Sequence, residues 1–397
     1  MIDLTVNKKF KYILFADLYF PEGLIDVISP ILIPIYLINK GLPVEIVTIV
    51  VGIAGIPWVI KFLWSGFIDK YSKQGHKKFI FIGSLVAVFC FFILAFIDPS
   101  QSIITFVIVF FISQIGQSFH DSTADAWAID ISEEKIRGKI NASMNAGHNF
   151  GIGFCAVTLS IIAESFGYNY MFIFAGLYIL IILIFPLLIK DTIQNKKQDK
   201  VTPILINEFK INKIKLVIIF AIIIGISSGL LAFVIPLFAT NILELSVSQI
   251  GLIAGFVPII TIVGSIIGGL ISDRWGRKIA IYTMILPSII LICTIMFTRS
   301  LLFLIIPYFI VILLSAGRWA ASSAMFMDVT NKKIRATEYS MFNSLEILGY
   351  VISSIFTGLL IGILGYNYIF IFISLTMIPP LIILYFIKLN RLKHPSK

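Results

Sequence analysis

Charged residues are scarce in this chain: Asp, Glu, Lys and Arg make up 13% of its 397 residues, against 58% hydrophobic residues. In a soluble globular domain about a quarter of the residues are charged. The mean hydropathy of +1.00 reflects the same deficit of polar surface. This scarcity excludes a water-soluble globule and indicates a protein that lies in a lipid bilayer.

Cysteine and the signatures of several enzyme classes are also sparse. The three cysteines lie in apolar stretches, at spacings that match neither a disulfide framework nor a metal site. The sequence contains no G-x-x-x-x-G-K-[ST] stretch, which disfavours ATP-driven pumping, and no H-E-x-x-H stretch. We therefore expect neither a metal nor a cofactor.

Long apolar runs take the place of polar surface. A helix needs about 20 residues to cross the hydrocarbon core of a bilayer. Runs of about that length occur at residues 12–38, 44–66, 79–97, 102–128, 139–163, 170–190, 216–239, 247–272, 279–298, 300–327, 337–363 and 367–388. They predict an all-α integral membrane protein with twelve transmembrane helices, six in each half.

Basic residues fall almost entirely on one side of these predicted spans. With the amino terminus inside, 27 of the 31 lie in cytoplasmic segments, two lie in outside loops (Lys40 and Arg299), and two lie within spans (Lys61 and Arg318). This bias predicts a protein of the cytoplasmic membrane with both termini in the cytoplasm. Because the net charge of +10 is spread over many short loops, we expect no nucleic-acid partner.

Two nearly identical octapeptides indicate an internal duplication. "GYNYMFIF" begins at Gly167 and "GYNYIFIF" at Gly365, an offset of 198 (365 minus 167) that also relates Asp130 to Asp328. A repeat with a fixed period over half of the chain predicts two equivalent domains. The predicted parts are a first six-helix bundle over residues 1–190, a polar cytoplasmic linker over 191–215 and a second six-helix bundle over 216–397.

The loop after the eighth predicted span carries a family signature. "GGLISDRWGRKIA", which begins at Gly268, resembles the loop motif of the major facilitator superfamily, and a degenerate copy, "SGFIDKYSKQGHKK", begins at Ser65. Three further stretches resemble the muropeptide permease and acetyl-coenzyme A transporter family. They are "KFLWSGFIDKY" from Lys61, "HDSTADAWAIDISEEKIRG" from His120 and "RATEYSMFNSL" from Arg335.

These resemblances imply a fold and an activity. The implied fold is two six-helix bundles related by an axis along the membrane normal, with the substrate near the midplane and alternating access. The implied activity is secondary active import of a small polar or amphipathic solute by proton symport; drug or metabolite export by proton antiport is the alternative. The expected partners are the substrate, protons and the lipid bilayer, and we expect a monomer that is not an enzyme.

Ionisable residues inside spans indicate function because each costs about 2.5–3.5 kcal/mol on insertion scales. Glu22 and Asp26 lie one turn apart on one face of the first predicted helix, which suits proton coupling. Asp121 and Asp125 lie on one face of the fourth helix, where they either carry protons or pair with a basic residue such as Lys61.

A second group of polar residues suits substrate binding. Arg318 needs a permanent counter-charge, either from Glu346, from an acid of the first half or from an anionic substrate. His148 is either a proton relay or a packing residue. The predicted substrate-binding residues are Gln114, Gln117, Asn145, His148, Arg318, Asn343 and Glu346.

Charged residues at the predicted cytoplasmic loops suit gating. Asp130 with Arg137, and Asp328 with Arg335, bracket equivalent turns in the two halves, and acid–base pairs there can close a gate or brace a bundle. The predicted gating residues are Asp69, Asp130, Arg137, Asp273, Arg274, Arg277, Asp328 and Arg335.

One stretch has the format of a serine hydrolase. "GISSG", which begins at Gly225, reads G-x-S-x-G and offers Ser227 or Ser228 as a nucleophile. A hydrolase elbow needs a strand-to-helix turn and a nearby histidine, whereas this stretch lies in a predicted transmembrane helix. Small residues in such helices more often allow close packing, so the hydrolase is a remote alternative.

Overall fold

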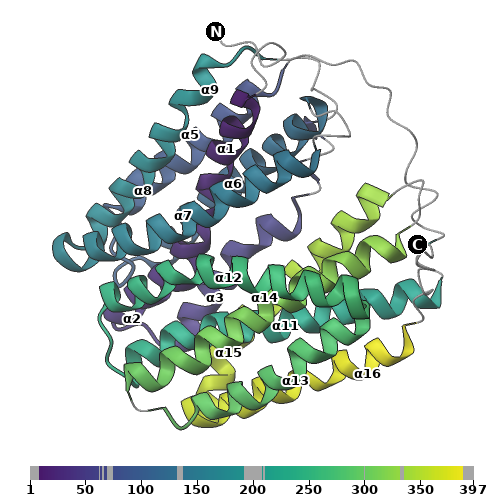
Figure 1. Ribbon diagram of the computed structural model, residues 1–397. Helices are drawn as coiled ribbons and strands as arrows, with labels where there is room; N and C mark the ends of the chain where they lie inside the picture. Colours follow the sequence, from purple (N-terminus) through teal and green to yellow (C-terminus); the bar gives the residue numbers. More distant parts are fainter. Residues whose placement is uncertain are drawn as a thin grey trace. The chain divides into compact units, whose positions relative to one another are not determined.

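The computed structural model describes residues 9–61, 63–64, 67–68, 75–131, 137–191, 208, 211–298, 300–330 and 335–387, apart from the side chains of residues 137, 138, 302 and 335–337. The regular elements of this part of the chain are helices (Figure 1). Their order is α1 Lys9–Val27, a π-helical turn Ile28–Leu32, α2 Ile33–Asn39, α3 Val44–Val59, α5 Lys77–Leu94, α6 Ile103–Ile131, α7 Arg137–Phe166, α8 Tyr168–Ile182, α9 Ile184–Leu188, α11 Asn212–Asn241, α12 Val247–Trp275, α13 Arg277–Ile295, α14 Leu301–Val329, α15 Arg335–Thr376 and α16 Ile378–Phe386.

The described helices match the predicted apolar runs closely. Among the described residues, 10 helical stretches are long and apolar enough to cross a membrane, and Val44–Val59 is a shorter apolar helix. The longest stretch, Glu338–Phe386, covers two predicted spans and leaves helical geometry at Gly365, where φ is 71°. Twelve separate spans stay a prediction.

Two compact units make up the chain, and neither is continuous in sequence. The first contains Met1–Lys197, Ala232–Pro258 and Ser354–Ile363. The second contains Gln198–Leu231, Ile259–Ser353 and Leu364–Lys397. The predicted division into two consecutive domains stays a prediction.

Glycine allows α1 and α7 to cross with their backbones almost in contact. A Cβ atom added to Gly147 would lie 1.8 Å from the carbonyl oxygen of Ala16, and one added to Gly23 would lie 2.2 Å from that of His148. In the second unit, a Cβ on Gly225 would lie 2.0 Å from the carbonyl oxygen of Glu346. His148 and Glu346 are 198 positions apart (346 minus 148), so α7 and α15 are crossed at positions that the sequence repeat relates, whereas the glycines Gly23 and Gly225 are 202 apart (225 minus 23).

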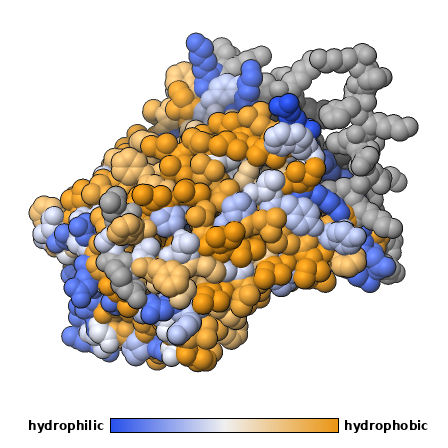
Figure 2. Space-filling view, turned by 60° about the horizontal axis from the view of Figure 1, so that its bottom comes forward, coloured by the Kyte–Doolittle hydropathy of each residue, from blue (hydrophilic) through white to orange (hydrophobic). Residues whose placement is uncertain are grey.

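Large apolar side chains also point outward, as expected of a surface in contact with lipid. Phe89, Phe96, Ile104 and Ile290 are 64%, 84%, 72% and 68% exposed. Figure 2 shows apolar side chains over most of the visible face. Soluble monomers rarely expose contiguous apolar patches of more than a few hundred Å². The chain is a multi-pass membrane protein.

The glycine crossing can be tested with a matched pair of substitutions. We expect Gly147→Ala to destabilise the protein by about 1–3 kcal/mol, because its methyl group would overlap the Ala16 carbonyl. Gly269→Ala is the control, because a Cβ atom there meets nothing within 4 Å and Ala is the better helix former. Thermal unfolding of both variants in detergent measures the difference, and equal melting temperatures would contradict the crossing.

Candidate functional site

An ion pair joins α1 to α7 close to the glycine crossing. Nε2 of His148 lies 2.9 Å from Oδ2 of Asp26, and the two side chains are 23% and 56% exposed. Glu22, one turn before Asp26 on α1, is half-buried. Glu22 interacts electrostatically with His148, Asp26, Asp121 and Lys61, so α1 faces both α6 and α7 at this level.

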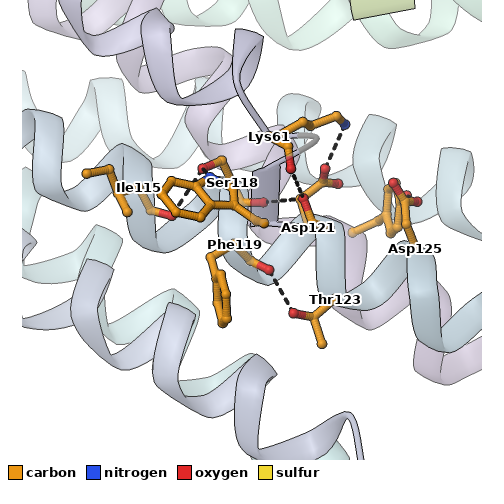
Figure 3. Close-up of polar contacts among 10 residues, drawn as sticks. Lys61, Ile115, Ser118, Phe119, Asp121, Thr123 and Asp125 are labelled. Carbon is orange, nitrogen blue, oxygen red and sulfur yellow. Dashed lines mark hydrogen bonds and ion pairs between the residues drawn. The ribbon is translucent and has the colours of Figure 1, made fainter. Parts of the chain in front are cut away.

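The carboxylates of α6 have two different partners. Lys61, just after α3, places Nζ 2.8 Å from Oδ2 of Asp121, which is 4% exposed (Figure 3). Asp125, one turn farther along α6, accepts a short hydrogen bond from the hydroxyl of Tyr19 on α1. Asp121 is thus in contact with Lys61, one of the basic partners considered for it, and its proton role stays a prediction.

The four predicted proton-coupling residues therefore lie in one cluster. Glu22 and Asp26 come from α1, and Asp121 and Asp125 come from α6. If all four carboxylates were ionised, the two cations of the cluster, Lys61 and a protonated His148, would leave a charge of −2 (2 minus 4). Unbalanced charge inside a membrane is costly, so this arrangement is suited to taking up protons.

The predicted polar residues of the first half fall into two groups. Gln114 and Gln117 are each 1% exposed on α6; Gln114 accepts a hydrogen bond from Nε1 of Trp58 (3.0 Å), whereas Nε2 of Gln117 has no partner in the part of the chain that the structure describes. Asn145 is exposed on α7 and donates to the carbonyl oxygen of Asn141 on its own helix (3.0 Å). The glutamines lie inside the first unit, and Asn145 lies on its surface.

His120 is a packing residue. Its Nδ1 lies 2.6 Å from Oγ of Ser84, and its Nε2 lies 2.8 Å from the carbonyl oxygen of Leu18. The side chain is 2% exposed. With both nitrogens bonded to neighbouring helices, His120 ties α5 and α1 to α6.

Arg318 on α14 takes its counter-charge from its own half. Its guanidinium donates to Oε1 of Glu346 (3.2 Å) and to Oγ of Ser228 on α11 (3.3 Å). The side chains of Arg318 and Glu346 are 7% and 14% exposed. Of the three counter-charges considered for Arg318, Glu346 is the one in contact.

The serines of "GISSG" have structural hydrogen bonds. Oγ of Ser227 donates to the carbonyl oxygen of Ile223 and to that of Thr376, both at 3.1 Å, and Ser228 accepts from Arg318. Both lie inside the continuous helix α11. A strand-to-helix elbow is therefore absent here, and close packing explains the glycines of this stretch.

Three polar atoms lie unbonded one helical turn from the Arg318–Glu346 pair. Ser322 follows Arg318 by four residues on α14 and Asn343 precedes Glu346 by three on α15. Successive spans run in opposite directions, so both residues lie on the same side of the pair. Oγ of Ser322, Oγ of Ser323 and Oδ1 of Asn343 are buried without a partner among the described residues.

The predicted gating residues of the second half form a small network. Arg277 at the start of α13 donates to Asp273 (2.6 Å) on α12 and to Asp328 (3.0 Å) on α14. Arg274 instead lies over the ring of Trp275, 5.5 Å from its centroid. The side chain of Arg335 lies outside the described residues.

In the first half, Asp130 pairs with a residue that the sequence did not single out. Oδ2 of Asp130 lies 2.9 Å from Nε2 of His76, which directly precedes α5. Asp69 and the side chain of Arg137 lie outside the described residues, so the predicted contacts of those two residues stay predictions.

An ion pair in the loop between α5 and α6 lowers the pKa of its carboxylate. Asp98, between α5 and α6, accepts hydrogen bonds from Nζ of Lys40 (2.8 Å) and from Ser100. These contacts lower the pKa of Asp98 from 3.8 to about 2. The carboxylate stays ionised at working pH, and the stability it contributes is lost only as the pH falls below 3.8 and through 2.

Three contacts of the site were missed from the sequence: Tyr19 with Asp125, Ser228 with Arg318, and His76 with Asp130. The first two join residues about 90 or more positions apart and depend on how the helices are rotated. A signal for the third was present, since His76 follows Gly75 as Arg277 follows Gly276. No group of three or more His, Cys, Asp or Glu side chains within the described ranges could hold a metal ion.

Comparison with protein families finds one match over nearly the whole chain. Residues 18–215 and 217–397 match the Major Facilitator Superfamily. The protein named transporter AmpG 2 of Rickettsia prowazekii is 22% identical over 388 residues, which cover 93% of each chain. The protein named transporter AmpG 1 of Rickettsia conorii is 26% identical over 368 residues, covering 84% of this chain and 87% of the relative.

Solved structures share the fold at low sequence identity. The xylose transporter XylE from E. coli, in an inward-open conformation, superposes with a TM-score of 0.76 at 14% identity, covering 98% of this chain and 97% of that one. The nucleoside transporter NupG superposes with a TM-score of 0.73 at 13% identity, covering 94% and 99%.

The contribution of the Arg318–Glu346 pair to the stability of the protein can be tested. We expect Arg318→Met to destabilise the protein by about 3–5 kcal/mol, because it leaves the carboxylate of Glu346 buried without a counter-charge. The double variant Arg318→Met/Glu346→Leu should recover most of that loss. Chemical unfolding of both variants in detergent measures the difference; a double variant less stable than the single one would show that Glu346 has another counter-charge.

Proposed function

The chain belongs to the major facilitator superfamily, and on that premise we propose that it is a proton-coupled transporter that imports a small polar or amphipathic solute by symport. The resemblance to this superfamily is confirmed, and the relatives named AmpG transporters confirm the narrower resemblance to the muropeptide permeases. These relatives are transporters and not enzymes, which retires the serine hydrolase.

The carboxylate cluster of the first half is the observation that carries proton coupling. Asp121 has a lysine as its partner, whereas Asp125 is bonded to the neutral hydroxyl of Tyr19 and interacts with Lys61 only electrostatically, and Asp26 is paired with a histidine. A proton that binds here neutralises one carboxylate and frees its partner. In the proposed cycle, Glu22, Asp26, Asp121 and Asp125 exchange protons, and His148 moves with Asp26 between the paired and unpaired states.

The second half supplies the proposed substrate contacts. Arg318 and Glu346 form a fixed charge pair, and Ser322, Ser323 and Asn343 offer hydrogen-bonding atoms without protein partners. A solute with several hydroxyl or amide groups could satisfy these atoms, which otherwise cost free energy while buried. We include Gln117 of the first half, whose Nε2 is also unbonded, and Gln114, Asn145 and His148 complete the proposed substrate path.

The remaining elements of the proposal concern the architecture. We propose twelve spans in two consecutive six-helix domains, with the break at Gly365 separating the last two spans. Both termini lie in the cytoplasm in this topology. Asp69, Asp130, Arg137, Asp273, Arg274, Arg277, Asp328 and Arg335 then lie at the cytoplasmic ends of helices, where pairs such as Arg277 with Asp328 can hold or release a gate during alternating access.

Proton coupling can be tested in proteoliposomes loaded with a pH-sensitive dye. We expect substrate-driven proton uptake to vanish in Asp26→Asn and in Glu22→Gln, because an amide cannot bind and release a proton. Binding of substrate, measured by thermal shift, should survive in at least one of them.

Asp98→Asn is the matched control for this experiment. It removes a carboxylate that is ion-paired to Lys40 in a loop, and since its pKa is near 2 it exchanges no protons at working pH. Coupling that persists in both Asp26→Asn and Glu22→Gln would remove these residues from the proton role. A proton flux opposite in direction to the substrate would identify antiport.

The substrate contacts can be tested with one variant and a control variant on the same helix. We expect Asn343→Ala to weaken substrate binding about tenfold, the equivalent of one hydrogen bond of about 1.4 kcal/mol. Ser353→Ala on the same helix is the control, because its hydroxyl already donates to the carbonyl oxygen of Tyr350 (2.7 Å). A thermal-shift screen over peptidoglycan fragments, peptides and nucleotide thioesters supplies the ligand; equal affinity of both variants for it would place the substrate elsewhere.

A further inference from the structure

Two loops of the chain share a backbone geometry. Gly75 has a φ of 88° and is separated from α5 by a single residue, and Gly276 has a φ of 96° and directly precedes α13. Both angles lie in the left-handed region that favours glycine. The residue after the glycine is His76 in the first loop and Arg277 in the second. Gly75 and Gly276 therefore occupy equivalent positions, although the first loop carries three extra residues.

The side chains that follow the glycines reach equivalent carboxylates. Nε of Arg277 lies 3.0 Å from Oδ2 of Asp328 near the end of α14, and Nε2 of His76 lies 2.9 Å from Oδ2 of Asp130 near the end of α6. Asp328 and Asp130 are 198 positions apart (328 minus 130). Each contact ties the start of one helix to the end of the next.

We propose that the contact between His76 and Asp130 is a proton-dependent brace, whereas the equivalent contact in the second half is permanent. Arginine stays charged at any pH a protein meets. Histidine ordinarily titrates near pH 6.5, so its charge changes between about pH 5 and 8. A protonated His76 forms a charge-assisted bond with Asp130; a neutral ring forms at most a neutral-donor bond, which is weaker.

Two carboxylates lie close to His76. Besides Asp130, the carboxylate of Asp191 lies close, because it accepts from the backbone N–H groups of His76 (3.2 Å) and Lys77 (3.1 Å). Of the described lysines nearby, Lys77 Nζ is bound to the carbonyl oxygen of Ile189 (2.7 Å) and Lys11 Nζ to that of Ile131 (3.1 Å). Lys78 Nζ lies 4.7 Å from the ring centroid of Phe79, and Lys190 directly precedes Asp191.

The ring of His76 is buried. It is 1% exposed and stacks on Trp127, with 6.3 Å between the ring centroids. Its Nδ1 has no partner among the described residues. A charge-assisted bond is about twice as strong as a neutral one, so the proposed brace is tight when the ring is protonated and loose when it is neutral.

This inference goes beyond the proposed function, since it concerns the ends of helices and not the transported solute. It requires neither a substrate nor proton coupling. The consequence is that the helix ends around His76 respond to pH, whereas those around Arg277 do not.

Hydrogen exchange of the full-length protein in detergent tests the brace without any ligand. Peptides covering residues 75–80 and 126–131 are followed at pH about 5.5 and about 8, on either side of the histidine pKa. After correction for the intrinsic pH dependence of exchange, we expect opening of these segments to increase about fivefold at the higher pH in the wild-type protein. Peptides covering residues 276–280 and 325–329 should show no change.

Two reciprocal variants complete the test. His76→Arg should remove the pH response of the first half, and Arg277→His should create one in the second half. Asp130→Asn should abolish the response without altering the ring. A flat wild-type response, or a response that persists in His76→Arg, would overturn the proposal. Arg277 is 18% exposed, whereas His76 is 1% exposed, so Arg277→His keeps the test available if the buried His76 tolerates no substitution.

Discussion

The hydrocarbon interior of the bilayer supplies no water to an ionised side chain, and this constraint organises the polar chemistry of the protein. Each charge inside a membrane span needs a partner or a proton. Asp121 has Lys61, Asp26 has His148 and Arg318 has Glu346. These pairs lie on different helices, so the requirement for partners also determines which helix faces are turned toward each other.

The two halves meet that constraint with different chemistry on the same backbone. Gly23 packs on the carbonyl of His148 and Gly225 packs on that of Glu346, and the repeat relates His148 to Glu346. In the first half this crossing carries a histidine paired to an aspartate, and both groups can change their charge. In the second half it carries a glutamate paired to an arginine, whose charge is permanent. In the proposed function, the first copy of this framework handles protons and the second supplies fixed polar contacts. The pairing of His76 in the first half against Arg277 in the second repeats this division at the helix ends.

Much of the candidate site could be predicted from residue types and helical spacing. Glu22 with Asp26 and Asp121 with Asp125 each share a helix face because residues three or four apart always do. Spacing along one helix says nothing about the partner on another, however. Arg318 had three candidate partners until the structure placed Glu346 beside it, and Asp130 was expected to meet Arg137, whereas the described contact is with His76. The extra residues before Gly75 obscured that alignment, because the equivalence of His76 and Arg277 depends on the φ angles of the preceding glycines.

The sequence by itself determined that this is a helical membrane protein with an internal repeat and a family resemblance. Its composition, the length of its apolar runs and the offset of 198 residues are local or periodic properties, and lipid allows few other ways to satisfy a buried backbone. Only the tertiary structure decided which charges are paired and which polar atoms of Ser322, Asn343 and Gln117 are left without partners. Those outcomes depend on how closely the helices cross and how each is rotated about its axis. Contacts between residues about 30 to 120 positions apart control both, and no local pattern encodes them.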